Sequence, residues 1–219
     1  MIKTTLSEQL KNTPYISKQN LGLMLQKKDD VLDYWIKKLV VDKTLIPLKK
    51  GLYISKYYYD IVCAQDSLEK EKYLLYLANV IRFPSYISLE YILSKNSFIP
   101  ETSFAITSIT VKSTRNYTTD IGKFYYKNIK QDLFYGYNTT PFKDKQIWEA
   151  SLAKALFDFL YIKPFKNSNE MKNYLTISGR FNWKIFDIAD KNELVEIITQ
   201  SQSNKMQRVL TIIKKNNLL

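Results

Sequence analysis

The residue pairs that come closest to a catalytic pattern are Ser67 with Lys70 and Ser151 with Lys154. In the Ser-x-x-Lys arrangement, a lysine one helical turn away activates a serine nucleophile. The enzymes that use this arrangement also carry Ser-Asp-Asn and Lys-Thr-Gly segments, and neither segment occurs in this chain. Because two unaccompanied matches show how loosely the spacing selects, we do not expect a serine enzyme.

Other catalytic chemistry lacks the residues that it needs. The 219 residues include no histidine, which excludes Ser-His-Asp and Cys-His nucleophile systems and imidazole metal ligands. The single cysteine, Cys63, can form neither an internal disulfide nor a thiolate metal cluster. The five glycines are too scattered for a phosphate-binding Gly-x-x-x-x-Gly-Lys or Gly-x-Gly-x-x-Gly loop. We therefore expect a protein that is not an enzyme and has no metal or cofactor.

Lysines give the chain its charge and its best candidate site. The chain carries 33 basic and 21 acidic residues, and eleven of the lysines but only six of the acidic residues lie among the first 60 positions. A net charge of +12 favours contact with nucleic acid or another polyanion. Lysines suit phosphate contacts, whereas Tyr34 is the better candidate for touching a base or sugar. The candidate DNA-binding residues are Lys27, Lys28, Tyr34, Lys37, Lys38, Lys49 and Lys50.

Three short helices are expected to position these side chains. Ile2, Leu6 and Leu10 recur every four residues and predict a helix over residues 1–12. Ser17 is expected to cap a second helix that ends at Leu25. A third helix, capped by Asp29 or Asp30, should end near Lys43. Its predicted buried face is Val31, Leu32, Trp35, Ile36, Leu39 and Val40, and its predicted solvent face is Asp33, Tyr34, Lys37 and Lys38.

A hairpin is expected to follow the third helix. Leu45-Ile46 and Leu52-Tyr53-Ile54 flank a basic turn in which Gly51 supplies the positive φ. Three helices and a basic-tipped hairpin predict a winged helix-turn-helix over residues 1–60, whose third helix would enter the major groove of duplex DNA. The helix lacks arginine and carries Asp30 and Asp33, so sequence discrimination should be modest.

Residues 61–219 predict a second domain, which makes the fold class α+β. A helical pattern over residues 57–82 connects the two parts, and residues 104–111, 121–129 and 133–137 read as strands of a small antiparallel sheet. Helices are expected over residues 89–93, 148–160, 194–198 and 206–213. Trp35 and Trp148 should anchor two separate cores. Tyr125, Tyr135 and Tyr137 leave an RNA-binding face open as an alternative to core packing.

Membrane association is not expected. The first residues lack the continuous apolar segment of a signal peptide, and no run approaches the ~18 apolar residues of a membrane span. These features predict a cytoplasmic protein without a membrane partner.

The order of segments resembles the AbiEi family, the antitoxins of type IV toxin-antitoxin systems linked to abortive phage infection. The resemblance covers roughly residues 15–165. It includes Lys50-Gly51-Leu52-Tyr53, Tyr86-Ile87-Ser88-Leu89-Glu90-Tyr91-Ile92-Leu93 and Phe98-Ile99-Pro100-Glu101. The most specific piece, Lys154-Ala155-Leu156-Phe157-Asp158-Phe159-Leu160-Tyr161, is close to the family's Lys-Ala-Leu-Leu-Asp-Leu-Leu-Tyr helix. The Pro-Glu that usually precedes that helix is replaced here by Leu152-Ala153, and the usual histidine is missing.

The resemblance implies a transcriptional autorepressor and antitoxin. Its winged helix would bind inverted repeats in its own promoter, and its C-terminal domain would counteract a nucleotidyltransferase-like toxin without needing a stable complex with it. Lys154 and Asp158 are the antitoxin-helix candidates, although their spacing fits a surface ion pair equally well. Two alternatives stay open. One is a winged-helix transcription regulator with a ligand-sensing or dimerising C-terminal domain and no toxin partner. The other is a protein-interaction module that does not touch DNA.

Overall fold

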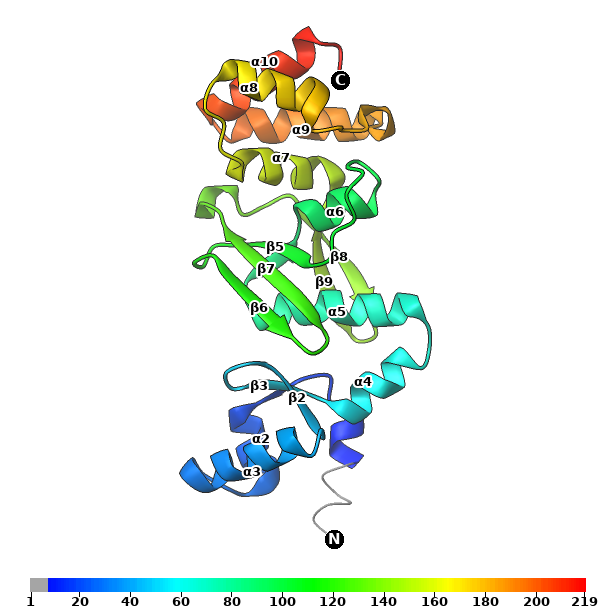
Figure 1. The fold of residues 1–219 in the computed structure, drawn as a ribbon, viewed down its shortest axis with the longest axis vertical. Coiled ribbons are helices and arrows are strands. Elements are labelled where there is room, and N and C mark those ends of the chain that lie inside the picture. The colour runs from blue at the N-terminus through cyan, green and yellow to red at the C-terminus, as the bar shows by residue number, and fades with distance from the viewer. Residues whose placement is uncertain (1–7) are drawn as a thin grey trace.

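A computed structural model describes residues 8–219 of the chain, an α+β protein with its N-terminal part at one end and its C-terminal helices at the other (Figure 1). The N-terminal part begins with helical residues 8–11, which bury Leu10; the remainder of the helix predicted over residues 1–12 lies outside the described residues. The elements that follow are β1 (Ile16–Ser17), α2 (Lys18–Leu25), α3 (Asp29–Val41), β2 (Leu45–Lys49) and β3 (Leu52–Ser55).

Local chemistry explains most of these boundaries. The Ser17 hydroxyl accepts a hydrogen bond from the Asn20 amide, and α2 stops where Gln26 takes a left-handed conformation. The hairpin turns at Gly51, whose φ of +77° suits glycine. The three strands pair antiparallel in the order β1-β3-β2, so the short β1 closes the hairpin into a sheet.

Helix α3 differs from its prediction in two ways. Neither Asp29 nor Asp30 caps it, because the helix already begins at Asp29 and Lys28 holds the cap position without a side-chain hydrogen bond. Val31, predicted to be buried, is 54% exposed, and Trp35 is only partly buried. The helix packs along Leu32 and Ile36, a narrower face than the apolar pattern suggested.

Two helices connect this part to a larger sheet. The single helical pattern predicted over residues 57–82 is divided into α4 (Lys56–Cys63) and α5 (Ser67–Ile81). The break comes where the Asp66 carboxylate accepts a hydrogen bond from the Glu69 amide and starts α5 anew.

The larger sheet is mixed, which corrects the prediction of a small antiparallel sheet. Its order is β6-β7-β5-β4-β9-β8, with the β4–β9 and β5–β7 pairs parallel and the others antiparallel. The strands are β4 (Ser85–Ile87), β5 (Ile106–Thr110), β6 (Arg115–Thr119), β7 (Gly122–Asn128), β8 (Tyr137–Phe142) and β9 (Lys145–Ala150).

The strand predictions fail at one hairpin. Of residues 133–137, predicted as a strand, Leu133 ends a short 3-10 helix, η1 (Gln131–Leu133), residues 134–136 are irregular, and only Tyr137 lies in a strand, as the first residue of β8. Trp148, predicted on a helix, lies in β9. The β8 sequence is mostly polar and contains Pro141, so it lacks the apolar alternation by which a strand is recognised.

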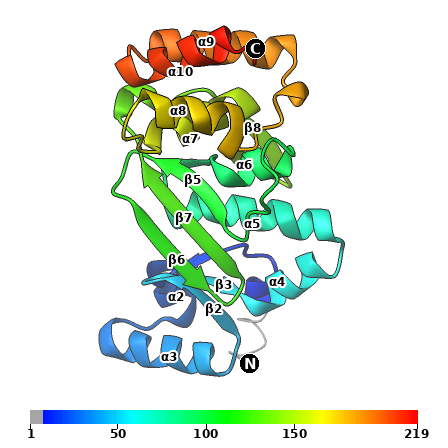
Figure 2. The same ribbon diagram turned by 45° about the horizontal axis from the view of Figure 1, so that its top comes forward.

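Helices cover both faces of this sheet. Helix α5 packs on one face, whereas α6 and α7 pack on the other, and α8, α9 and α10 stack beyond α7 (Figures 1 and 2). These helices are α6 (Glu90–Lys95), α7 (Leu152–Ile162), α8 (Ser168–Asn173), α9 (Ile188–Gln200) and α10 (Asn204–Lys215), with a π-helical turn η2 (Tyr174–Ser178) and a 3-10 turn η3 (Trp183–Ile185). Among residues 8–219, no helix combines the length and the apolar character required to cross a membrane.

Two apolar cores form, but they do not divide at residue 60. A small core joins Leu10, Ile16, Leu21, Leu32, Ile36 and Leu45. The hairpin residues Ile46, Leu48, Leu52 and Ile54 belong instead to the large core of the six-stranded sheet and its helices. The hairpin of the N-terminal part is therefore packed from both sides.

Candidate nucleic-acid interface and a buried ion pair

The N-terminal part presents a set of free cationic side chains. Lys27 and Lys28 lie exposed in the turn between α2 and α3, Lys37 and Lys38 lie exposed along α3, and Lys50 is exposed at the hairpin turn. None of these five lysines forms an ion pair with another residue of the described chain 8–219. Their charges are thus available to an external anion.

Tyr34 stands among these lysines. Its side chain is 62% exposed, and its ring meets the Trp35 ring edge-on at 6.2 Å between centroids. The Lys38 Nζ lies 5.3 Å from the centroid of the Trp35 ring, a cation–π distance. The structure therefore places Tyr34, Lys37 and Lys38 on the solvent face of α3, as the helical spacing predicted, with the partly buried Trp35 beside them.

An acidic residue on the same helix is already neutralised. The Asp33 carboxylate lies 2.5 Å from the Nζ of Lys18, the first residue of α2. The hydrogen bond from Lys18 to Asp33 raises the pKa of Lys18, because it stabilises the charged ammonium. The pair links the two helices and reduces the repulsion that Asp33 would exert on an approaching phosphate.

Lys49, the remaining candidate lysine, is partly buried and is held against the end of α5. Its Nζ donates a hydrogen bond of 2.5 Å to the carbonyl oxygen of Ile81, at the end of α5. Burial lowers the pKa of Lys49, and the nearby charges of Lys112 and Arg82 lower it further. Its neighbour Lys50 points to solvent, so the two lysines of the turn have different environments.

A groove between α2 and α3 was not expected from the sequence. It has a volume of about 1140 Å³, and its lining includes Leu23, Val31, Lys27 and Lys28. Leu23 is 74% exposed, although it lies within a helix and is fully apolar. The apolar pattern of the sequence placed Val31 on the buried face of α3, whereas the structure exposes it in the wall of this groove.

The second pair of candidates, Lys154 and Asp158, is buried. Both side chains on α7 have no exposed surface, and the Lys154 Nζ lies 2.7 Å from Asp158 Oδ1. Of the two interpretations of their spacing, the surface ion pair is therefore wrong. The sheet covers one side of α7 and α9 covers the other, so the face of α7 that carries Lys154 and Asp158 has no access to solvent.

Hydrogen bonds complete the buried pair. The Lys154 ammonium also donates to the Leu133 carbonyl oxygen at 2.9 Å. The second carboxylate oxygen of Asp158 accepts hydrogen bonds from the Tyr86 hydroxyl at 3.0 Å and the Ser88 hydroxyl at 2.8 Å. Sequence reasoning missed Tyr86 and Ser88, which come from a strand end some 70 residues away. The Ser88 hydroxyl does not cap the following helix, α6, because it donates to Asp158.

Burial dominates the electrostatics of this cluster. It raises the pKa of Asp158, although Lys154, Ser88 and Tyr86 act in the opposite direction. Burial and the adjacent carboxylate also raise the pKa of Tyr86 well above its usual value. A lysine enclosed in this way cannot activate Ser151, whose hydroxyl donates to Glu193 at 2.6 Å and caps α7. The arrangement therefore holds β4, α7 and the segment before β8 together.

Comparisons with known proteins add no further assignment. The sequence matches no protein-family model, and no curated protein is significantly similar to it. The resemblance to the AbiEi antitoxins rests on the residues and segment order given above.

Proposed function

We propose that the N-terminal part is a winged helix-turn-helix that binds duplex DNA through α3 and the hairpin turn. The order helix, β1, α2, α3, β2, β3 supports this proposal, because it places a pair of helices joined by a short turn before a two-stranded wing. The observation that carries the proposal is the set of five exposed lysines, Lys27, Lys28, Lys37, Lys38 and Lys50, around the free face of α3.

The biological role that we propose is autorepression combined with antitoxicity. The DNA site would be an inverted repeat in the protein's own promoter, and the opposed toxin would be nucleotidyltransferase-like. This part of the proposal depends on the resemblance to the AbiEi family. Because Lys154 and Asp158 are buried, they would serve antitoxicity by holding α7 in place and not by touching a toxin.

Salt-dependent binding tests the DNA proposal. The double variant Lys37→Ala/Lys38→Ala should weaken binding to every duplex, because displaced counterions contribute to the affinity of each phosphate interaction. The slope of log affinity against log salt should fall by about 0.9 for each phosphate interaction removed. Fluorescence anisotropy with a labelled duplex from the upstream region measures both quantities. The double variant Lys214→Ala/Lys215→Ala, which removes two exposed charges from α10, is the matched control. If both variants behave alike, α3 is not the DNA-binding helix.

Co-expression tests the antitoxin proposal. The full chain should relieve the growth defect caused by the product of the adjacent gene, if that product is a nucleotidyltransferase-like toxin. Lys37→Ala/Lys38→Ala should retain this protection while losing repression of a promoter fusion. Normal repression without any protection would favour a transcription regulator that has no toxin partner.

The groove between α2 and α3 favours a second candidate, a protein-interaction module. Exposed Leu23 and Val31 form apolar walls that a partner helix could cover. An apolar contact of this kind depends weakly on salt, whereas phosphate contacts depend strongly on it. Leu23→Asp should abolish such a protein contact and should leave the salt slope of duplex binding unchanged.

A further inference from the structure

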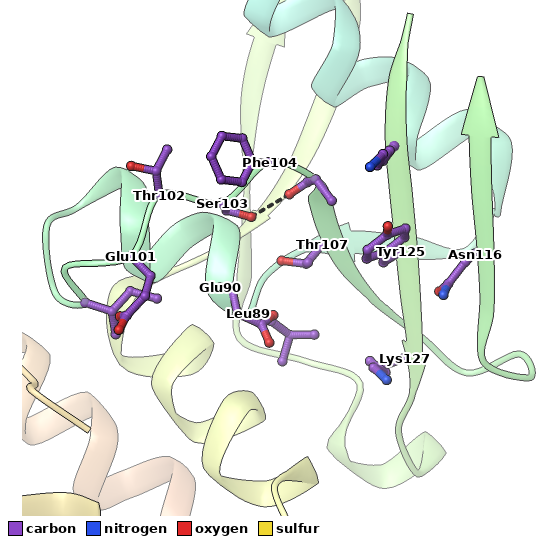
Figure 3. A pocket seen from close by; sticks show the side chains of 13 residues that line it. Leu89, Glu90, Glu101, Thr102, Ser103, Phe104, Thr107, Asn116, Tyr125 and Lys127 are labelled. Atoms are coloured by element: carbon purple, nitrogen blue, oxygen red, sulfur yellow. Dashed lines mark hydrogen bonds between the residues drawn. The ribbon is translucent and has the colours of Figure 1, made fainter. Parts of the chain in front are cut away.

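A second pocket lies on the six-stranded sheet, far along the chain from the N-terminal lysines. It has a volume of about 510 Å³ and is bounded by the open face of β6 and β7, the segment from Ile99 to Ala105, and the start of α6. Figure 3 shows Tyr125 and Lys127 on one strand and Asn116 on its neighbour, with Phe104 and Ser103 on the opposite wall. Nothing in the proposed DNA-binding role uses these residues.

Strand alternation explains why this face carries polar side chains. Phe124 and Tyr126 of β7 are fully buried, and the Tyr126 hydroxyl donates to the Ala78 carbonyl oxygen of α5. Because successive side chains of a strand point to opposite faces, Lys123, Tyr125 and Lys127 project to the other side, where they line the pocket. Strand β7 is thus anchored on one face and exposes an aromatic ring between two lysines on the other.

The β7 side of the pocket is positively charged. Lys123 and Lys127 are exposed, and neither forms an ion pair within residues 8–219. The pocket also contains the carboxylates of Glu90 and Glu101, which lie toward α6 and the loop (Figure 3). Glu101 forms an ion pair with Arg180, so its charge is offset.

We propose that this pocket binds a single-stranded nucleic acid, with one base stacked on Tyr125 and the phosphates on either side of that base bound by Lys123 and Lys127. Aromatic rings on a basic surface are the usual platform for single strands, because every base presents a face that can stack. Each lysine is two residues from Tyr125, or roughly 6.6 Å along the strand, so the two charges flank a stacked base symmetrically. A free nucleotide has phosphate on one side only, whereas a strand has it on both.

Neighbouring groups extend the fit. The strand register pairs Asn116 directly with Tyr125, which places an amide beside the stacked base. Phe104 is 90% exposed at the rim, where a second base could stack. Most of the ring of Tyr137, in contrast, is taken up by stacking with Trp148 at 5.4 Å and with Tyr86 at 4.9 Å. Of the three tyrosines considered from the sequence, Tyr125 alone lines this pocket.

Anisotropy of labelled decamers, dT10 and rU10, tests the proposal on the full chain. Tyr125→Leu should weaken decamer binding about tenfold, because the stacking surface is removed. Tyr125→Phe keeps that surface and should bind as the unsubstituted protein does. Lys123→Ala/Lys127→Ala should lower the salt slope by about 1.4, from two phosphate interactions on a single strand. The matched control is again Lys214→Ala/Lys215→Ala, which should leave decamer binding unchanged.

Three results would overturn this assignment. The first is that Tyr125→Leu binds the decamers as tightly as the unsubstituted protein does, while circular dichroism shows that the variant is folded. The second is ATP binding as tightly as the decamers, which would indicate a free nucleotide. The third is loss of decamer binding in Lys37→Ala/Lys38→Ala, which would place single strands on α3. Because duplex binding is measured separately, failure here leaves the DNA-binding proposal standing, and the reverse also holds.

Discussion

Two Lys-Asp pairs of identical spacing differ in their burial. Lys154 and Asp158 have no exposed side-chain surface, whereas Lys56 and Asp60 are 41% and 54% exposed on α4. A buried charge that loses its partner keeps its desolvation cost, but an exposed one returns to water. Asp158→Ala should therefore lower the free energy of unfolding by about 3–5 kcal/mol. Asp60→Ala should lower it by no more than about 0.5 kcal/mol.

Urea unfolding of the two single variants measures this difference directly. Equal losses would contradict the burial of the α7 pair. Replacing both Lys154 and Asp158 with apolar residues of similar size should cost less than Asp158→Ala alone, because no uncompensated charge remains.

Lys49 and Lys50, the adjacent lysines of the hairpin turn, should affect different properties: Lys50 should affect duplex binding, and Lys49 should affect stability. Lys50→Met should reduce the salt slope of duplex binding by about 0.9, since an exposed cation is removed. Lys49→Met should leave that slope unchanged and should lower the free energy of unfolding by about 1 kcal/mol, because the hydrogen bond to the Ile81 carbonyl is broken. Anisotropy and urea unfolding of the same two proteins give both values. A slope change in the Lys49 variant would show that its side chain leaves the carbonyl to contact DNA.

At the scale of elements, helix α3 has a face whose position can be tested. Ile36 is 5% exposed and Val31 is 54% exposed, although both belong to the apolar pattern. Ile36→Ala should cost about 2–5 kcal/mol, as for a large residue removed from a core. Val31→Ala should cost less than about 0.5 kcal/mol, as is usual at the surface. If Val31→Ala were the more costly change, the helix would be rotated from its position against β2.

At the scale of the molecule, the hairpin joins two parts that the sequence pattern separates at residue 60. Ile54 and Leu52 pack in the large core, and the Tyr73 hydroxyl of α5 donates to the Pro14 carbonyl oxygen. We therefore expect residues 8–219 to unfold in one cooperative transition, in contrast to the independent domains that the sequence predicts. Ile54→Ala should shift the thermal transition as a whole when followed by circular dichroism and by tryptophan fluorescence. Two resolved thermal transitions, only one of which is shifted by Ile54→Ala, would instead indicate two domains that unfold independently.

The contacts between the hairpin and the large core also affect a fragment of the chain that begins near Tyr57 and therefore lacks the hairpin. Such a fragment would expose the part of the large core that Leu48, Leu52 and Ile54 cover. Its failure to protect against a toxin would be interpretable only if the fragment were folded. Full-length Lys37→Ala/Lys38→Ala is accordingly the better means of separating repression from antitoxicity.

The sequence by itself determined the features that depend on near neighbours. The 3.6-residue period located α2, α3, α10 and the C-terminal part of α9, and Gly51 located the hairpin turn, because each depends on residues a few positions apart. The same period placed Tyr34, Lys37 and Lys38 on the solvent face of α3. The absence of histidine excludes Ser-His-Asp and Cys-His nucleophile systems and imidazole metal ligands, whatever the fold.

Only the tertiary structure decided which groups are buried and which are shared. Spacing placed Lys154 and Asp158 on one face of a helix, but the sheet and α9 packing around α7 removed that face from water. The mixed strand order arises from β4–β9 and β5–β7 pairings between segments that local patterns do not connect. The Tyr125 pocket and the attachment of Lys49 to Ile81 likewise join residues distant in the chain. Burial depends on the sum of such contacts, and these cannot be inferred from a pattern of residues that are close together in the sequence.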